Sequence, residues 1–398
     1  MRVGTPGFVP ARLTEARAAR RLASMSALAR LLSVSASTVT RWEDGSSAPD
    51  ADALTALTNA LRVRREFFLR PVFDSPRPVF FRSLSSTLVR DIDYQHAQMH
   101  WMQEISSVLQ HYVDFPATDF PDVLGGASYK QLRDEDIERI ALDLRRHWRI
   151  GEGPCADMVA LLERVGVVVG TIEMGTAKLD GLCSWSASEN RPHILLATDK
   201  MCFPRRQMDA AHEMAHAVLH KDVSEDEFKK DLKAIEAQAF RLASAFLLPS
   251  TTYPHEVRHP SLAALLSLKE RWRVSIKAQI KRLADLEIVP PEYAPDLYKL
   301  YSAKGWTREE PLDGEWKVSE PRMLADAMSL IVESGLRTKA DLLAVEFTMS
   351  PGDVENLTSL PPGWFSSRTG EVVQLKQDTQ RVSVGRDTPG VVVPLFRK

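Results

Sequence analysis

The stretch AAHEMAHAVLH, residues 210–220, decides how the centre of this 398-residue chain folds. It belongs to a longer run, 205–220, that has no glycine or proline and is rich in alanine, which is typical of a helix. His212 and His216 are four residues apart, so their side chains share one face of that helix. Two neutral imidazoles one turn apart can bind a zinc ion (Zn2+), and Glu213 beside them can take a proton from water there. The alternative is a buried helix whose histidines are only structural.

A catalytic zinc ion takes three protein ligands, and the segment 225–249 offers a third. The segment has the pattern of a second helix that stops at its final proline. The apolar face of this helix is formed by Ala239, Leu242, Ala243, Phe246 and Leu247. Glu236 lies one turn before Ala239, at the edge of this face and twenty residues beyond His216. The residues alone leave two interpretations open: a metal ligand, or a solvated glutamate in a charged helix start.

His220 and Cys183 are two further candidates for the same site. His220 follows His216 by four residues and lies near the same face. It is either a contact for the substrate or transition state, or a helix-end histidine that interacts with the helix dipole. Cys183 lies in a short apolar run upstream. Its thiolate would be a fourth zinc ligand and a latency switch, and the alternative is a small buried hydrophobic residue.

The N-terminal seventy residues read as a string of short helices. Ser35 is a suitable N-cap for a helix over 36–42, and Gly45 ends that helix. Two short helices joined by a turn can place the second in a DNA major groove. The side chains expected to face DNA are Ser37, Thr38, Thr40 and Arg41. Val39 and Trp42 are expected to face inward, and a plain helical bundle is the alternative.

Charge and cysteine content narrow the class of protein. The formal net charge is −2, but residues 1–72 hold eleven arginines and no lysine against six acidic residues. This basic module suggests a nucleic-acid partner, whereas the rest of the chain is acidic. Three cysteines without a CxxC pair indicate reduced thiols in a cytoplasmic protein. The sequence shows no signal-peptide pattern and no apolar run of about 20 residues that would cross a membrane.

The remaining segments carry weaker signals. A helical pattern over 87–112 includes His96 and His100, which share a face but have no adjacent glutamate, so surface histidines are favoured over metal ligands. Three short apolar runs, 165–174, 181–187 and 193–198, predict a small antiparallel sheet. The turn at Val274-Ser275 resembles that of a helix-turn-helix. The C-terminal runs EVVQL and VVVPLF are β-type, and no ligand is indicated for the region 291–398.

Two family resemblances sharpen these expectations. LARLLSVSASTVTRWEDGSSAPDADALTALTNAL resembles the Xre/Cro-type helix-turn-helix family, with Met25 where glutamine often contacts phosphate. AAHEMAHAVLH followed by EAQAFRLASAFLLP resembles the ImmA/IrrE family of metallo-endopeptidases. In the second motif Phe240 stands where asparagine is common. The resemblance implies that His212, His216 and Glu236 are zinc ligands and that Glu213 is the general base.

The resemblance also implies a biological role. Such peptidases cleave a DNA-bound helix-turn-helix repressor and so switch on genes after stress, after DNA damage or in phage (antiviral) defence. The expected partners are that repressor and DNA, single- or double-stranded, with no membrane; the oligomeric state is left open. One alternative is a DNA-binding transcription regulator whose peptidase-like domain senses a ligand without catalysis. Another is an antitoxin-type protein that blocks a partner.

The fold class we expect is α+β and mostly helical. An all-α helix-turn-helix domain is expected over 1–72, followed by a linker and helical segment over 73–145. A zincin-like peptidase domain with the small antiparallel sheet is expected over 146–290. A mixed helical and short-strand region, sensory or partner-docking, is expected over 291–398.

Overall fold

A computed structural model describes residues 4–73, 80–81, 89–175, 179–199 and 202–366. The N-terminal part is a bundle of α1 (Pro10–Ala18), α2 (Met25–Leu32), α3 (Ala36–Glu43), α4 (Ala51–Leu61) and the 3-10 helix η1 (Arg65–Leu69). Ser24, Ser35 and Asp50 cap α2, α3 and α4, because each side-chain oxygen accepts a backbone N–H of the first turn. Ser33 has a left-handed φ of 55°, which ends α2 and turns the chain into α3. The predicted helix-turn-helix geometry is therefore confirmed.

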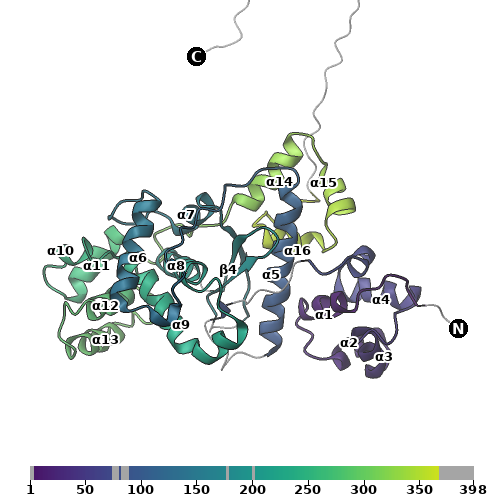
Figure 1. Cartoon of the computed structure of the whole chain (residues 1–398), viewed down its shortest axis with the longest axis horizontal. Coiled ribbons are helices and arrows are strands. Elements are labelled where there is room, and N and C mark those ends of the chain that lie inside the picture. Colours follow the sequence, from purple (N-terminus) through teal and green to yellow (C-terminus); the bar gives the residue numbers. More distant parts are fainter. Residues whose placement is uncertain (1–3, 74–79, 82–88, 176–178, 200–201, 367–398) are drawn as a thin grey trace, which may run out of the picture. The chain divides into compact units, whose positions relative to one another are not determined.

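A small sheet lies at the centre of the chain (Figure 1). Its strands are β1 (Phe80–Phe81), β2 (Val168–Ile172), β3 (Gly181–Ser186) and β4 (Arg191–Ala197), in the order β1-β3-β4-β2. The prediction of an antiparallel sheet was wrong in one respect, because β2 and β4 are parallel while β3 is antiparallel to both of its neighbours. The sheet is mixed because the chain runs from β2 to β3 on the far side of β4, and the antiparallel β3–β4 pair then places β4 parallel to β2.

Helices cover both faces of the sheet. Cys183 and Ile194 belong to a core shared with the helices α8 (Phe203–Leu219) and α9 (Glu225–Leu247). Leu182 and Leu195, one residue along in each strand, belong to a second core shared with α5 (Val89–Gln110) and the N-terminal bundle. Every residue of β3 and β4 is buried, as expected when neither face of a sheet meets water.

The remaining helices lie before and after these elements in the chain (Figure 1). Before the sheet come the 3-10 helix η2 (Tyr129–Gln131), α6 (Asp134–His147) and α7 (Met158–Arg164). After α9 come α10 (Tyr253–Glu256), α11 (Leu262–Trp272), α12 (Ile276–Asp285) and α13 (Tyr293–Ala303). The last described elements are α14 (Met323–Glu333), α15 (Lys339–Asp341), the π-helix η3 (Leu342–Glu346) and α16 (Pro351–Leu357).

The turn between α11 and α12 repeats the local geometry of the turn between α2 and α3. Arg273 has a left-handed φ of 53°, and Ser275 caps α12, as the sequence suggested. The predicted strands EVVQL and VVVPLF lie outside the described residues. In the part of the chain that the structure describes, no helix is long and apolar enough to cross a membrane.

Several N-terminal arginines are used for contacts inside the chain. Arg12 donates to Glu104 of α5 at 2.9 Å. Arg20 makes two hydrogen bonds to Asp353 of α16, at 2.8 and 2.6 Å. The N-terminal charge excess is therefore partly neutralised by the body of the protein, and it overstates the charge available to DNA. The expected domain boundaries at residues 72, 145 and 290 remain a prediction.

Candidate metal centre

Helix α8 brings the two histidines of its HExxH motif together in a buried position. The segment is helical because it is free of breakers after Pro204, which stands in the first turn, where proline is tolerated. The Nε2 atoms of His212 and His216 lie 3.1 Å apart. The two side chains are only 4% and 1% exposed, so water competes little for them.

Glu236 on α9 completes a triangle of residues with His212 and His216. Its Oε2 lies 3.3 Å from Nε2 of His212, and its Oε1 lies 3.3 Å from Nε2 of His216. Buried alanines on both helices, whose small side chains permit close packing, are Ala211, Ala215, Ala239 and Ala243. Among the residues that the structure describes, His212, His216 and Glu236 form the one group of three or more His, Cys, Asp or Glu side chains that could hold a metal ion.

The spacing of these residues is compatible with a tetrahedral zinc ion, because one ligand atom from each residue lies within 4.8 Å of the others and each Nε2 meets a carboxylate oxygen at 3.3 Å. Ligand atoms at about 2.0–2.1 Å from such an ion are roughly 3.3–3.4 Å apart along each edge of the tetrahedron. Burial raises the pKa of the Glu236 carboxyl, but hydrogen bonding and charge from His212 and His216 outweigh burial and hold this pKa well below its ordinary value. The carboxylate is therefore ionised at neutral pH, which a metal ligand requires.

Glu213 lies next to this triangle and faces the start of β3. The side chain is buried, and a Cβ atom placed on Gly181 would lie 2.8 Å from its Oε1 and 2.8 Å from its Cγ. Gly181 has no positive φ, so the backbone there does not itself demand glycine. The missing side chain instead makes room for the Glu213 carboxylate beside the two histidines.

This close approach gives a testable prediction. Gly181→Ala is expected to displace the Glu213 carboxylate and to lower the rate of peptide cleavage by about 10²-fold, because a shift of about 1 Å misplaces a proton acceptor. Zinc content is expected to stay unchanged, because the three atoms nearest to the added methyl group all belong to Glu213. The measurement is the cleavage rate together with bound zinc per chain. Gly314→Ala, where the nearest atom is 4.0 Å away, is the control. Equal rates for the two variants would contradict the prediction.

The structure places Cys183 in the core and apart from the ligand triangle. Its side chain is fully buried, and its thiol is not in the group of converging ligand atoms. Burial, and then the negative charge of Glu213, raise the pKa of this thiol well above its ordinary value. Full burial and a place outside the group of converging ligand atoms favour the small buried hydrophobic residue over the latency switch.

His220 is buried at the end of α8 and does not face solvent. Its backbone N–H donates to the carbonyl of His216, which closes the last turn of the helix. Burial, and to a smaller degree His216, lower the pKa of His220 to about 3, so its ring is neutral at pH 7. A neutral ring gains little from the helix dipole. A contact of His220 with a substrate or transition state remains a prediction.

Two neighbours of the site were not predicted. Gln238 accepts a hydrogen bond from His220 at 3.1 Å. The ring of Phe240, one turn after Glu236 on α9, packs on the ring of His212 with 4.2 Å between centroids. The position of Phe240 in the motif was visible in the sequence as a departure from asparagine, whereas nothing in the sequence distinguished Gln238 from other polar residues of the helix.

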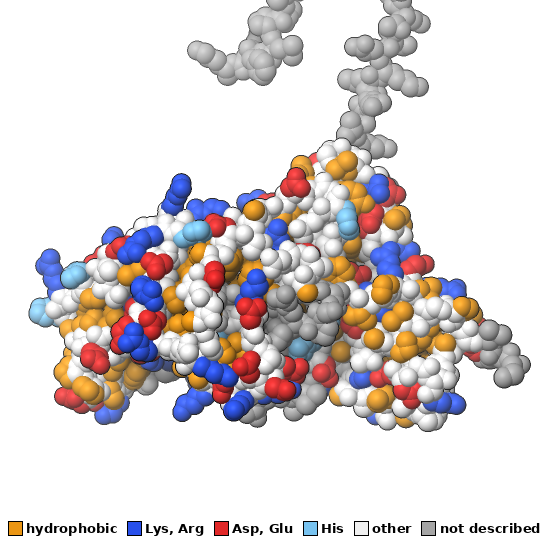
Figure 2. Space-filling view, in the orientation of Figure 1, with side chains coloured by type: hydrophobic (Ala, Val, Ile, Leu, Met, Phe, Trp, Pro, Cys, Tyr) orange, Lys and Arg blue, Asp and Glu red, His pale blue; other side chains and the backbone are white. Residues whose placement is uncertain are grey.

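The helix-turn-helix residues present a small polar face. Ser37, Thr40 and Arg41 are exposed on α3, while Val39 and Trp42 are buried. Thr38 is half-buried, and its hydroxyl lies 2.8 Å from the hydroxyl of the N-cap Ser35, so its contact with DNA stays a prediction. Basic and acidic side chains are interspersed over the face of the molecule drawn in Figure 2.

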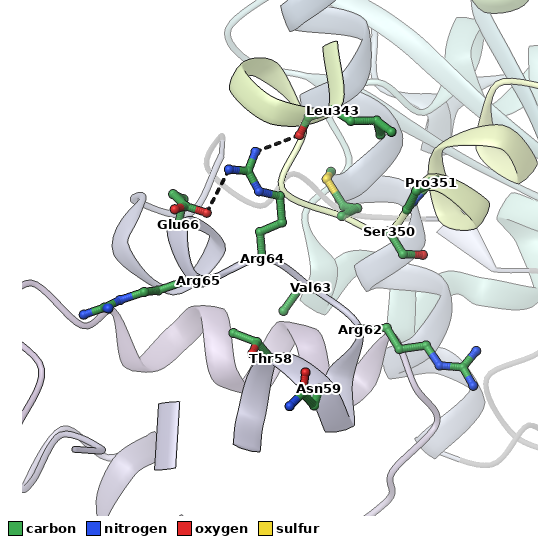
Figure 3. Close-up of a pocket in the computed structure, with 11 residues that line it drawn as sticks. Thr58, Asn59, Arg62, Val63, Arg64, Arg65, Glu66, Leu343, Ser350 and Pro351 are labelled. Atoms are coloured by element: carbon green, nitrogen blue, oxygen red, sulfur yellow. Dashed lines mark hydrogen bonds and ion pairs between the residues drawn. The ribbon is translucent and has the colours of Figure 1, made fainter. Parts of the chain in front are cut away.

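A pocket of about 640 Å³ lies elsewhere, between the end of α4 and residues 343–351 (Figure 3). Arg64 crosses it and donates to the carbonyl of Leu343 at 2.7 Å. The side chains of Arg62 and Arg65 point away from each other at opposite sides of the pocket (Figure 3). Because the Arg62 and Arg65 side chains do not converge on one point, the pocket does not have the arrangement of an anion site. It is a contact region between α4 and residues 343–351 that Arg64 bridges.

Fold and site together define a helix-turn-helix protein that also carries a candidate metallopeptidase centre. Comparison with protein families agrees: residues 17–68 match the helix-turn-helix family model, and residues 162–284 match the model of the IrrE N-terminal-like domain of peptidase family M78. The chain therefore carries an N-terminal helix-turn-helix domain and an ImmA/IrrE-type peptidase domain. No curated protein matches the chain.

Proposed function

We propose that this protein is a cytoplasmic zinc endopeptidase that cleaves a helix-turn-helix transcriptional repressor. The observation that carries the proposal is the triangle of His212, His216 and Glu236. The two Nε2 atoms lie 3.1 Å apart, each lies 3.3 Å from one of the two Glu236 carboxylate oxygens, and Glu213 is buried on the same helix as the histidines. Three protein ligands leave one position open, which is the arrangement of catalytic zinc sites.

Each residue of the centre has a role in peptide hydrolysis. A zinc ion bound there supplies a Lewis acid for the scissile carbonyl and lowers the pKa of water. The two imidazoles and the Glu236 carboxylate hold the ion, with a total charge of −1 from the protein. Glu213 accepts the proton of the attacking water and returns it to the leaving amine. The burial of Glu213 strengthens its interaction with these charges.

The substrate class follows from the pairing of the two domains. In the ImmA/IrrE family, which the peptidase domain resembles, the substrate is a DNA-bound repressor of the helix-turn-helix type. A DNA-binding domain on the peptidase would bring enzyme and substrate to the same DNA. Cleavage would derepress genes of stress response, DNA damage or antiviral defence. Single- or double-stranded DNA is the proposed activator.

The exposed face of α3 is the proposed DNA contact, with Arg41 as its charged residue. Arg41→Ala is expected to weaken DNA binding and to reduce the slope of log K against log salt concentration by about 0.9, the value for one lost phosphate contact. The measurement is a titration of labelled duplex DNA at several salt concentrations. Arg139→Ala on α6, also exposed, is the control and is expected to keep the slope of the parent. An unchanged slope for Arg41→Ala would place DNA elsewhere.

The proposal as a whole is tested with the purified chain and a candidate repressor. The best candidate is a small helix-turn-helix repressor encoded beside this protein. The two are incubated with and without DNA, zinc and a chelator, and products are identified by mass spectrometry. One zinc per chain and cleavage that the chelator stops would support the proposal. A chain that binds no stoichiometric metal would end it.

A further inference from the structure

The second ring nitrogen of each zinc-binding histidine must carry a proton, and the structure indicates what holds that proton at His216. The Nε2 of His216 faces His212 and Glu236. Its Nδ1 lies 3.1 Å from the Nδ1 of His220. Only one proton fits between two nitrogens at that distance, so one of the two Nδ1 atoms donates and the other accepts.

Gln238 decides which of the two nitrogens donates. Its amide nitrogen donates to the backbone carbonyl of Tyr129 at 2.8 Å, and a carbonyl can only accept. The amide oxygen of Gln238 is thereby turned towards Nε2 of His220, at 3.1 Å. Because that oxygen can only accept, Nε2 of His220 carries the proton. The Nδ1 of the neutral His220 ring is then an acceptor.

We infer that Tyr129, Gln238 and His220 form a directional hydrogen-bond chain that fixes the tautomer of His216. The accepting Nδ1 of His220 takes the Nδ1–H of His216, which leaves the lone pair on Nε2 of His216 directed at His212 and Glu236. His216 is thus held in the form that binds a metal. His220 and Gln238 are positioning residues, and the inference rests on the proposed zinc site.

The surroundings keep this chain in place. His220 is fully buried, and Tyr129 is 6% exposed. The Tyr129 ring packs edge-on against the ring of His220 with 5.7 Å between centroids. The Tyr129 hydroxyl in turn donates to Asp231 of α9 at 2.9 Å. In this buried environment, reversing one hydrogen bond would place two donors or two acceptors face to face, which would cost free energy. Helix α9 therefore supplies both a proposed ligand, Glu236, and Gln238, which orients the ligand His216 through His220.

The test uses a matched pair of substitutions at His220. Asparagine offers an oxygen close to the position of Nδ1, whereas leucine has a similar shape and no acceptor. His220→Leu is expected to lower zinc affinity by about 10–100-fold, the usual effect of losing a partner of a metal-binding histidine. His220→Asn is expected to stay within about threefold of the parent, because it keeps the acceptor for His216. Affinity is measured by competition with a chromophoric chelator.

A second readout does not depend on the metal. Nitrogen-15 NMR of histidine-labelled, zinc-free protein distinguishes the two tautomers of His216, assigned with His216→Gln. The parent and His220→Asn are expected to show the Nδ1–H form, and His220→Leu a gain of the Nε2–H form. Gln238→Met, which removes both of its hydrogen bonds, is expected to mix the two forms and provides the test if His220→Leu does not fold.

The outcomes separate the inference from the proposed function. The Nε2–H form in the parent, or parent-like zinc affinity in a folded His220→Leu, would overturn the inference even if the protein cleaves its substrate. A parent that shows the Nδ1–H form but binds no zinc would support the hydrogen-bond chain and overturn the zinc peptidase.

Discussion

Glu213→Gln is expected to lower the rate of repressor cleavage by about 10³-fold while one zinc ion stays bound. Glutamine keeps the size of glutamate but cannot accept the proton of the attacking water, and general-base catalysis contributes roughly 10²–10⁴-fold. The ligand atoms of His212, His216 and Glu236 are untouched, so metal content should not change. The measurement is a single-turnover cleavage rate with zinc analysis of the same sample. Glu270→Gln on α11 is an exposed control for the same chemical change.

This variant also separates the proposed peptidase from its rivals. A regulator that senses a ligand without catalysis would regulate equally well with glutamine at position 213, because its output needs no proton transfer. An antitoxin-type protein would bind its partner with or without Glu213 and would not cleave it even as the parent. Full cleavage by Glu213→Gln would remove Glu213 from the mechanism. The buried Glu213, with Gly181 making room for it, favours catalysis over these rivals.

The parts of the fold that the sequence predicted are those set by local spacing. The i, i+4 pair of histidines implies a shared helical face wherever the helix lies. Ser35 and Gly45 mark the ends of α3, with Ser35 as the N-cap and Gly45 at a φ of 78° just after the helix. The helix pattern placed Glu236 at the edge of an apolar face, but only the family resemblance favoured a metal ligand over a solvated glutamate, because its partnership with α8 depends on how two helices pack. That packing is a tertiary fact that a single helix pattern does not contain.

The features that the sequence missed all depend on contacts between distant segments. The parallel pairing of β2 and β4 cannot be read from alternation, which fixes the faces of a strand but not its neighbours. The role of Arg20 inside the chain depends on Asp353, 333 residues away. His220 was interpreted from its own helix alone, whereas the structure also gives it a hydrogen-bond partner on α9, Gln238. Spacing in the sequence identified the candidate catalytic and metal-binding residues, but it did not identify the residues from other segments that form hydrogen bonds with them.

The second large effect concerns the metal as a part of the folded structure. A ligand that binds only the folded chain adds about 4 kcal/mol to the free energy of unfolding when its free concentration is 1,000 times Kd. Removing zinc from the parent with a chelator is therefore expected to lower Tm by roughly 10 °C for a domain of this size. We expect a large effect because His212, His216 and Glu236 lie together at a buried position. Without the ion, no shared ligand holds these three polar side chains together.

Glu236→Gln is expected to abolish this zinc-dependent shift. The amide oxygen is a much weaker ligand than the ionised carboxylate, whose low pKa reflects the two histidines that face it. Melting curves with zinc and with chelator should then coincide for Glu236→Gln and differ for the parent. Glu225→Gln, the same substitution at an exposed position of α9, is expected to keep the full shift. Coincident curves for the parent, or an undiminished shift in Glu236→Gln, would mean that the triangle between α8 and α9 is not where the metal binds.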